Sequence, residues 1–134
     1  VTDMKHLFQD KTRFNENISR WDVSNVTNMH AMFLGALSFN QPVGNWDTSN
    51  VTAMSAMFWG AQSFNQPVGN WDVSKVTEIG TMFWYALSFN QDLSKWNIRP
   101  TTDSYDMFNH PYIMQEGYEP RHVWMMEMNC VFVE

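Results

Sequence analysis

The sequence predicts an α/β solenoid, a coil of about five repeats in which each repeat contributes one short strand and one short helix. Three observations lead to this fold class. The chain repeats itself every 25 residues, the apolar residues within a repeat recur at helical spacing, and Pro and Gly interrupt the rest of each repeat. One repeat cannot bury its own apolar face, so we expect successive repeats to stack and share a core.

Four full copies of the repeat and one partial copy share a single register. They cover residues 1–25, 26–50, 51–75, 76–100 and 101–108. A Met-Phe pair, a Phe-Asn pair and a Trp recur at the same places in the copies. The aromatic columns are Phe8, Phe33, Phe58, Phe83 and Phe108; Phe14, Phe39, Phe64 and Phe89; and Trp21, Trp46, Trp71 and Trp96. We expect these columns to form ladders from coil to coil.

A short helix is predicted at the start of each copy. In the third copy the apolar positions are spaced as on one face of two to three helical turns. They are Val51, Met54, Met57, Phe58 and Ala61. Asp47 and Ser49 suit the N-terminus of such a helix, and Gly60 suits its end. Further along, Pro67 and Gly69 restrict the predicted strand to residues 68–71.

The Asn that follows each Phe of the second Phe column has two interpretations. It is either a turn residue that satisfies its own backbone, or part of a ladder that bonds the backbone amides of the adjacent coil. We favour a ladder of inward-pointing side chains, because a buried turn must pair its backbone groups. The residues concerned are Asn40, Asn65 and Asn90.

Composition and length exclude several classes of protein. A chain of 134 residues is one domain by length, and its net charge of −6 disfavours non-specific binding to nucleic acid. No stretch approaches the roughly 20 apolar residues that a membrane span needs. We divide the chain into a repeat solenoid, residues 1–108, and a C-terminal cap or docking tail, residues 109–134.

No constellation of residues points to catalysis, a cofactor or a metal. The histidines, which share no ligand spacing, are His6, His30, His110 and His122. His6 and His30 nevertheless fall close enough in the register to be neighbours on successive coils. Cys130 is alone, so it has no partner for an internal disulfide. We therefore predict no enzyme activity, no catalytic residue, no cofactor and no metal site.

Two further patterns each have a structural and a functional interpretation. The carboxylates of Asp22, Asp47 and Asp72, each followed two residues later by Ser, fit turns better than calcium sites, because the glycine-rich pattern of calcium solenoids is absent. Three Asn-x-Ser/Thr sequons have meaning only in a eukaryotic secretory pathway. They begin at Asn17, Asn25 and Asn50.

The repeated unit, written VTxMxxMFxGAxSFNQxxxNWDVSN, resembles the tandem repeat of BspA-like leucine-rich repeat surface proteins. That unit also occurs in mycoplasma lipoproteins and in some protist and algal proteins. The resemblance covers about residues 1–108, where the Met-Phe, Phe-Asn and Trp-Asp pairs recur in phase. It implies a right-handed, leucine-rich-repeat-like coil on a cell surface, used for adhesion or protein contact and without catalytic residues. The first copy departs from the unit, since Asp10-Lys11 replaces Gly-Ala.

The residue after each Met-Phe pair is the candidate contact residue. On the predicted helix this position lies about 140° from Met54, off the apolar face, yet two copies have Trp there. We expect the column to form an apolar strip that binds a protein partner, with the alternative that the side chains fill gaps between coils. The strip consists of Leu34, Trp59, Trp84 and Tyr85.

The function predicted is a non-enzymatic protein-interaction or adhesion module at the cell surface or outside the cell. The alternative is a structural accessory subunit of a larger, possibly membrane-bound, complex, in an organelle lumen or peripheral to a membrane. Such a subunit would dock through its Val1 end or through residues 109–134. A free module should cover both ends of its stack with its own chain, because exposed end coils are adhesive.

Overall fold

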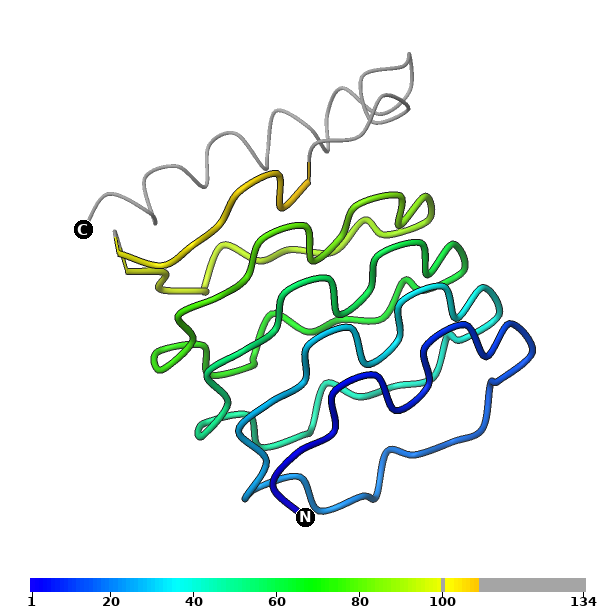
Figure 1. The fold of residues 1–134 in the computed structure, drawn as a ribbon, viewed down its shortest axis with the longest axis horizontal. Helices are drawn as coiled ribbons and strands as arrows, with labels where there is room; N and C mark the ends of the chain where they lie inside the picture. Colours follow the sequence, from blue (N-terminus) through cyan, green and yellow to red (C-terminus); the bar gives the residue numbers. More distant parts are fainter. Residues whose placement is uncertain (100, 109–134) are drawn as a thin grey trace.

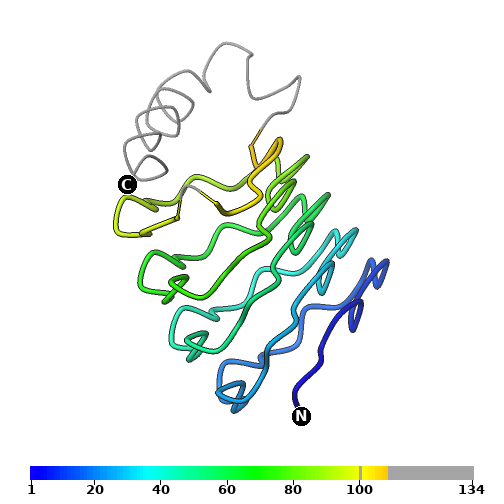
Figure 2. The same ribbon diagram turned by 60° about the vertical axis from the view of Figure 1, so that its left-hand side comes forward.

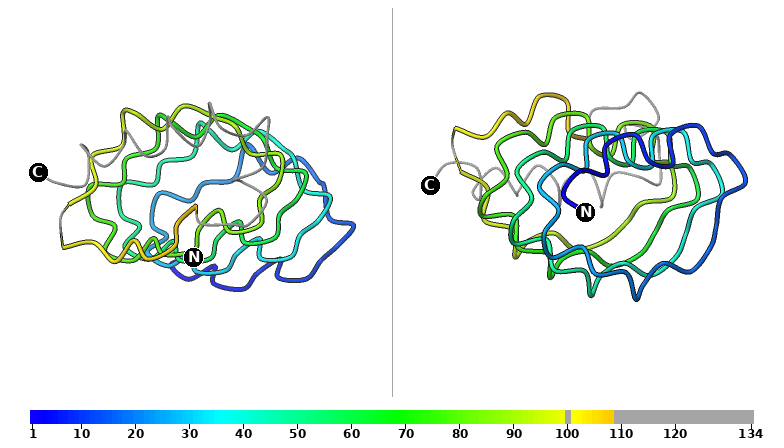
Figure 3. Two further views of the ribbon diagram at one scale, coloured as in Figure 1. Left: turned by 90° about the horizontal axis from the view of Figure 1, so that it is seen from above. Right: turned by 60° about the horizontal axis from the view of Figure 1, so that its bottom comes forward.

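The computed structural model describes residues 1–99 and 101–108, and in these residues each 25-residue repeat forms one coil. The coils lie one above another in chain order, from the blue first coil to the gold partial fifth coil (Figure 1). A second view shows the same stack from the side (Figure 2), and a view from above shows that the coils overlie one another (Figure 3). The predicted cap at residues 109–134, with Cys130, lies outside the described residues.

The predicted α/β fold class is wrong. The described residues contain no helix and no extended strand. Their strand-like pairing consists of isolated parallel bridges that join one residue of each coil to its equivalent in the next. The bridges link Asp3, Asn28, Ala53, Glu78 and Asp103 in succession. The repeats therefore stack, but not as the strand-plus-helix units of a leucine-rich-repeat-like coil.

Consecutive tight turns replace the predicted helix of the third coil. The amides of Met57, Trp59 and Ala61 each donate to the carbonyl oxygen three residues earlier, at 3.0–3.2 Å. The amides between them, those of Phe58 and Gly60 for example, donate instead to the next coil, at 2.9 and 2.7 Å. A helix would direct every amide to the residue four positions back. Here every second amide closes a turn within the coil, and the amides between them form hydrogen bonds to the next coil.

Positive backbone φ angles mark these turns. Ala56 has a φ of 58° and Gly60 a φ of 73°, each at the third residue of a turn, where type II turns require a positive φ. Glycine adopts this conformation without the clash of a Cβ atom, which explains Gly60. The column of Ala56 adopts it in every coil although it contains no glycine. Its other members are His6, Ala31, Thr81 and Asp106.

The predicted strand at residues 68–71 is also a turn. The amide of Trp71 donates to the carbonyl oxygen of Val68 at 3.1 Å, and no strand is present there. A Cβ atom on Gly69 would lie 2.5 Å from the carbonyl oxygen of Asp92 in the next coil. The third and fourth coils approach so closely here that a side chain at position 69 would have to displace the backbone.

Two phenylalanine ladders fill the centre of the stack. Within a coil the two rings stack face to face with centroids 3.9–4.1 Å apart. Between coils, rings of the first ladder are 5.4–5.7 Å apart, and those of the second 5.6–6.0 Å apart. Phe58 and Phe64 are fully buried. The expectation that equal columns form ladders is confirmed for the phenylalanines.

The tryptophan column forms a third ladder, and its indoles hydrogen-bond to backbone carbonyl oxygens of the preceding coil. The indole nitrogens of Trp46, Trp71 and Trp96 donate to backbone carbonyl oxygens of the preceding coil at 2.9–3.1 Å. Trp46 and Trp71 are nearly parallel, with ring centroids 6.4 Å apart. The ladder thus buries aromatic surface and gives each of these carbonyl oxygens, which already accepts from a turn amide, a second hydrogen bond from the next coil.

The asparagine ladder is present, but it lies on the rim of the stack. The side-chain oxygen of Asn40 accepts from the backbone amide of Asn65, and that of Asn65 accepts from Asn90, both at 2.9 Å. Asn65 and Asn90 are exposed. The predicted bonds between coils are confirmed, whereas the predicted inward orientation is wrong.

Candidate interaction surface

The column that follows the Met-Phe pairs lies at the edge of the turn-rich segment. Backbone bonds place its members side by side, because Gly35 donates to the carbonyl oxygen of Trp59 and Gly60 donates to that of Trp84, each at 2.7 Å. Together with Tyr85 this column makes up the set named here the aromatic strip. Its members are Leu34, Trp59, Trp84 and Tyr85.

The rings of the strip contact one another across coils and within one coil. The centroids of Trp59 and Trp84 are 6.1 Å apart, with the rings inclined at 54°. Trp84 and Tyr85 meet edge to face with centroids 5.7 Å apart. Trp59 is 38% exposed, whereas Leu34, Trp84 and Tyr85 are half-buried. The structure therefore brings the three aromatic members together at a surface of the stack.

Local turns orient the strip away from the core. The amide of Trp59 donates to the carbonyl oxygen of Ala56 at 3.1 Å, and that of Trp84 donates to Thr81 at the same distance. Phe58, the residue before Trp59, is fully buried. Since neighbouring side chains diverge in these turns, burial of the phenylalanine ladder leaves the next side chain at the rim.

Leucine side chains beyond the strip add apolar surface that the sequence did not single out. Leu37, three residues after Leu34, is 39% exposed. Leu87 occupies the same position of the fourth coil and is half-buried. The signal was present in the sequence, since these leucines recur where the third coil has Gln62.

In the second and third coils the chain that follows the strip carries no acidic or basic side chain, whereas Asp10 of the first coil lies next to Gly35 and the fourth coil carries Asp92 and Lys95. Residues 34–46 and residues 59–71 contain no such side chain. The carboxylates lie instead in the turns around Asp47 and Asp72, where they cap their own backbone. A partner that binds the strip would therefore meet mainly apolar and amide groups along the second and third coils.

The Asp-x-Ser column consists of self-contained turns. In the second coil one carboxylate oxygen of Asp47 accepts from the backbone amide of Ser49 at 3.0 Å and from its hydroxyl at 2.6 Å. These two hydrogen bonds hold the pKa of Asp47 below its usual value. Asp22 and Asp72 show the same lowered pKa for the same reason. The turn interpretation explains the carboxylates without a cation.

The histidines of the first two coils are neighbours, as their register predicted. The rings of His6 and His30 meet edge to face with centroids 5.2 Å apart. The Nδ1 atom of His6 also hydrogen-bonds the side-chain oxygen of Gln9. In the part of the chain that the structure describes, no three His, Cys, Asp or Glu side chains converge as metal ligands would.

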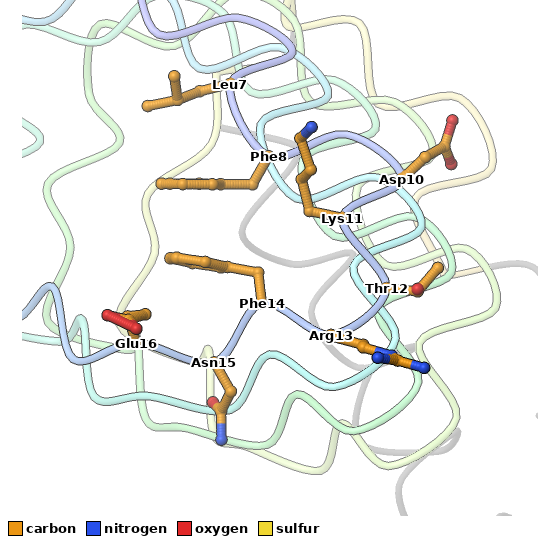
Figure 4. A pocket seen from close by; sticks show the side chains of 9 residues that line it. All are labelled: Leu7, Phe8, Asp10, Lys11, Thr12, Arg13, Phe14, Asn15 and Glu16. Carbon is orange, nitrogen blue, oxygen red and sulfur yellow. The ribbon is translucent and has the colours of Figure 1, made fainter.

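A hollow of about 790 Å³ lies against the first coil. Its wall includes the side chains of Leu7, Phe8 and Phe14, which point to one side of the chain (Figure 4). A smaller hollow of about 290 Å³ lies between turns near Gly69 and Lys95. The first hollow is apolar on the side of the rings and open.

This is a tandem-repeat protein. One repeated unit forms the stacked coils, aromatic ladders run through them, and the aromatic strip is exposed on the side of the stack. The chain belongs to the family described as "Mycoplasma protein of unknown function, DUF285", which matches residues 1–119. This is the Mycoplasma/BspA-like repeat family, so the resemblance of the repeat unit is confirmed. No curated protein and no solved structure matches the chain. Within residues 1–99 and 101–108 there is no helix of the length and hydropathy that crossing a membrane requires.

Proposed function

We propose that this chain is a non-enzymatic protein-interaction module of a surface protein and that it binds its partner through the aromatic strip. The observation that carries the proposal is the exposure of Trp59, 38%, in the third coil, where the members of the phenylalanine and tryptophan ladders are buried. Membership of a repeat family with surface members supports the location, and an adhesive role fits both.

The energetics of the stack support a binding role for the strip. The phenylalanine ladders and the tryptophan ladder already join each coil to the next, so Trp59 and Trp84 are additional to that core. Exposed apolar clusters usually mark interaction sites, and Trp is the residue most enriched among those that dominate binding energy. The strip also stands on a rigid base, which lowers the entropy lost on binding.

The opposing explanation is that the strip stabilises the stack itself. Trp84 is half-buried and touches both Trp59 and Tyr85, so part of its surface is already covered. The two explanations differ in what happens when both indoles are removed. Loss of stability would indicate packing, and loss of binding by a folded chain would indicate an interface.

The experiment uses the double variant Trp59→Ser with Trp84→Ser and a displayed library of random peptides. Peptides selected on the unaltered chain are measured against both proteins. We expect the double variant to fold and to lose about tenfold or more in affinity, since removal of each such anchor typically costs more than 1 kcal/mol. The matched control is Tyr105→Ser, which removes an aromatic side chain that is 74% exposed in a different column.

Two results would contradict the proposal. In the first, the selected peptides bind the double variant as tightly as the unaltered chain. In the second, the double variant unfolds while Tyr105→Ser stays folded, which would assign the strip to packing.

A further inference from the structure

We propose that the aromatic strip binds arginine side chains on an exposed segment of the partner protein. The inference rests on the proposed function and names the chemistry that the same strip recognises. It is carried by the inclination of the rings to one another, by the backbone conformation of Tyr85, and by the sign of the charges in the coil segments beside Trp84 and Tyr85.

The rings of the strip are inclined to one another, unlike those of the buried ladders. Trp59 and Trp84 are inclined at 54°, and Trp84 and Tyr85 at 61°. Phe58 and Phe83, which belong to a buried ladder of the same two coils, are inclined at only 6°. Parallel rings cover one another's faces, whereas inclined rings leave part of a face to another group. Because the face of an aromatic ring is its negative side, such a surface attracts a cation that comes within about 6 Å of a ring centroid.

Tyr85 occupies a backbone conformation that suits glycine. Its φ is 59°, and the residues at the same place in the second and third coils are Gly35 and Gly60, with φ angles of 70° and 73°. A bulky side chain is strained at such a φ, and strained residues cluster at ligand-binding sites. The amide of Ala86 still donates to the carbonyl oxygen of Phe83 at 3.1 Å, so the turn closes as in the other coils. The fourth coil thus bears a strain that glycine would avoid, which is expected where the ring itself has a function.

The charged side chains of the neighbouring coil segments are all acidic. Residues 76–94 and residues 101–108 contain carboxylates but no Lys, Arg or His. Asp106 lies along the fourth coil just before the strip, because the carbonyl groups of the residues on either side of it accept from the amides of Thr81 and Phe83 at 2.8 and 3.0 Å. The whole chain also carries a net charge of −6. A field of this sign attracts a cationic partner and repels an acidic one.

Arginine fits these features better than other cations do. Its planar guanidinium stacks on aromatic faces, is more weakly hydrated than an ammonium group, and offers donors that match a carboxylate. A quaternary ammonium group would use the rings alone, because it has no hydrogen-bond donor for Asp106 or for the exposed Glu78. The partner inferred is therefore a protein segment whose arginine side chains reach the rings and the carboxylates together.

The test titrates the full chain with a synthetic peptide in which glycine and arginine alternate. Calorimetry measures the affinity, and nuclear magnetic resonance follows the indole signals of Trp59 and Trp84. We expect saturable binding that shifts both signals. The matched control peptide has citrulline in place of every arginine, which keeps the shape of the side chain and removes its charge. We expect this peptide to bind at least about tenfold more weakly, since several cation–π contacts are lost at once.

Protein variants separate the rings from general attraction between charges. Tyr85→Gly keeps every charge and restores the residue type of the second and third coils, so it should fold and bind the arginine peptide at least about threefold more weakly. Leu37→Ser removes apolar surface that is 39% exposed but no ring, and it should bind the arginine peptide as the unaltered chain does.

Three results would overturn the inference. They are no saturable binding of the arginine peptide at millimolar concentration, equal affinity of the arginine and citrulline peptides, and full affinity in a folded Tyr85→Gly chain. If library peptides without arginine still bind through Trp59 and Trp84, the proposed function stands and this inference alone fails. If no peptide depends on the two indoles, both fail.

Discussion

Removal of one ring from the centre of the phenylalanine ladder tests how the stack is held together. Phe64 is fully buried, lies 4.0 Å from the ring of Phe58, and lies 5.9 and 6.0 Å from Phe39 and Phe89 in the adjacent coils. Transfer of the side chain to water costs about 1.5–3 kcal/mol, and each lost ring contact adds about 0.5–1.5 kcal/mol. With three ring contacts these terms sum to about 3–7.5 kcal/mol. We expect Phe64→Ala to lower the free energy of unfolding by about 3–5 kcal/mol, the lower part of this sum and the usual range for a buried Phe.

The same change in the first coil is the internal comparison. Phe14 is only half-buried and has a ring neighbour on one side of the stack, Phe39, at 5.6 Å. We expect Phe14→Ala to cost about 2 kcal/mol, because less surface returns to water and fewer ring contacts are lost.

Urea unfolding followed by near-ultraviolet circular dichroism measures both variants. The slopes with denaturant must agree between variants, because repeat proteins can unfold in parts. Equal losses at Phe14 and Phe64 would refute the reasoning, since they would mean that neighbours on both sides do not add to the stability of a ring.

Three further predictions concern hydrogen bonds between and within coils. Asn65→Ala removes the acceptor for the Asn90 amide and should destabilise by about 1 kcal/mol in urea unfolding, whereas Asn65→Asp, which keeps the acceptor, should cost less. Trp71→Phe keeps a ring in the ladder but removes the indole hydrogen bond to the Val43 carbonyl oxygen, which still accepts from the Trp46 amide, so we expect a loss of about 1 kcal/mol in urea unfolding. The lowered pKa of Asp47 stabilises the fold above the unfolded value near pH 3.9, and this contribution is lost as pH falls through the lower folded value. Asp47→Asn keeps the hydrogen-bond acceptor of the turn but cannot titrate, so its urea unfolding midpoint should change less between pH 5 and pH 2 than that of the unaltered chain. An equal change in both proteins would contradict the role assigned to the Asp47 carboxylate.

The sequence predicted the stacking of repeats because stacking depends on the period alone. Columns such as Phe64 and Trp71 recur every 25 residues, and their burial in ladders follows from that recurrence. The hydrogen-bonded role of Asn65 followed in the same way, although its exposure did not, because periodicity does not distinguish the inside of a coil from its rim.

The predicted helix failed for a physical reason. Turns that close every two or three residues place Val51, Met54 and Met57 on one side of the chain, as a helix would. The positive φ of Ala56 distinguishes these turns from a helix. The sequence does not reveal it, because alanine is not a residue type that favours a positive φ. Short helices are also costly to nucleate, so bonds to adjacent coils can replace helical ones.

The aromatic strip was inferred from an angle around a helix that does not exist. Trp59 is nevertheless exposed, because its neighbour Phe58 is directed inward by the turn. In the sequence, the only valid evidence for the strip was that large apolar side chains recur in that column. Its role as a contact surface stays a prediction.

The direction of the backbone ladder limits the symmetry of any assembly built on it. The amides of Met4, His6 and Phe8 all donate toward the second coil, and the carbonyl groups between them all face the opposite way. Two first coils that met face to face would oppose carbonyl to carbonyl, so a two-fold symmetric dimer cannot continue the ladder. Association through this ladder is necessarily head to tail, and a head-to-tail contact either closes into a ring or extends as a polar filament.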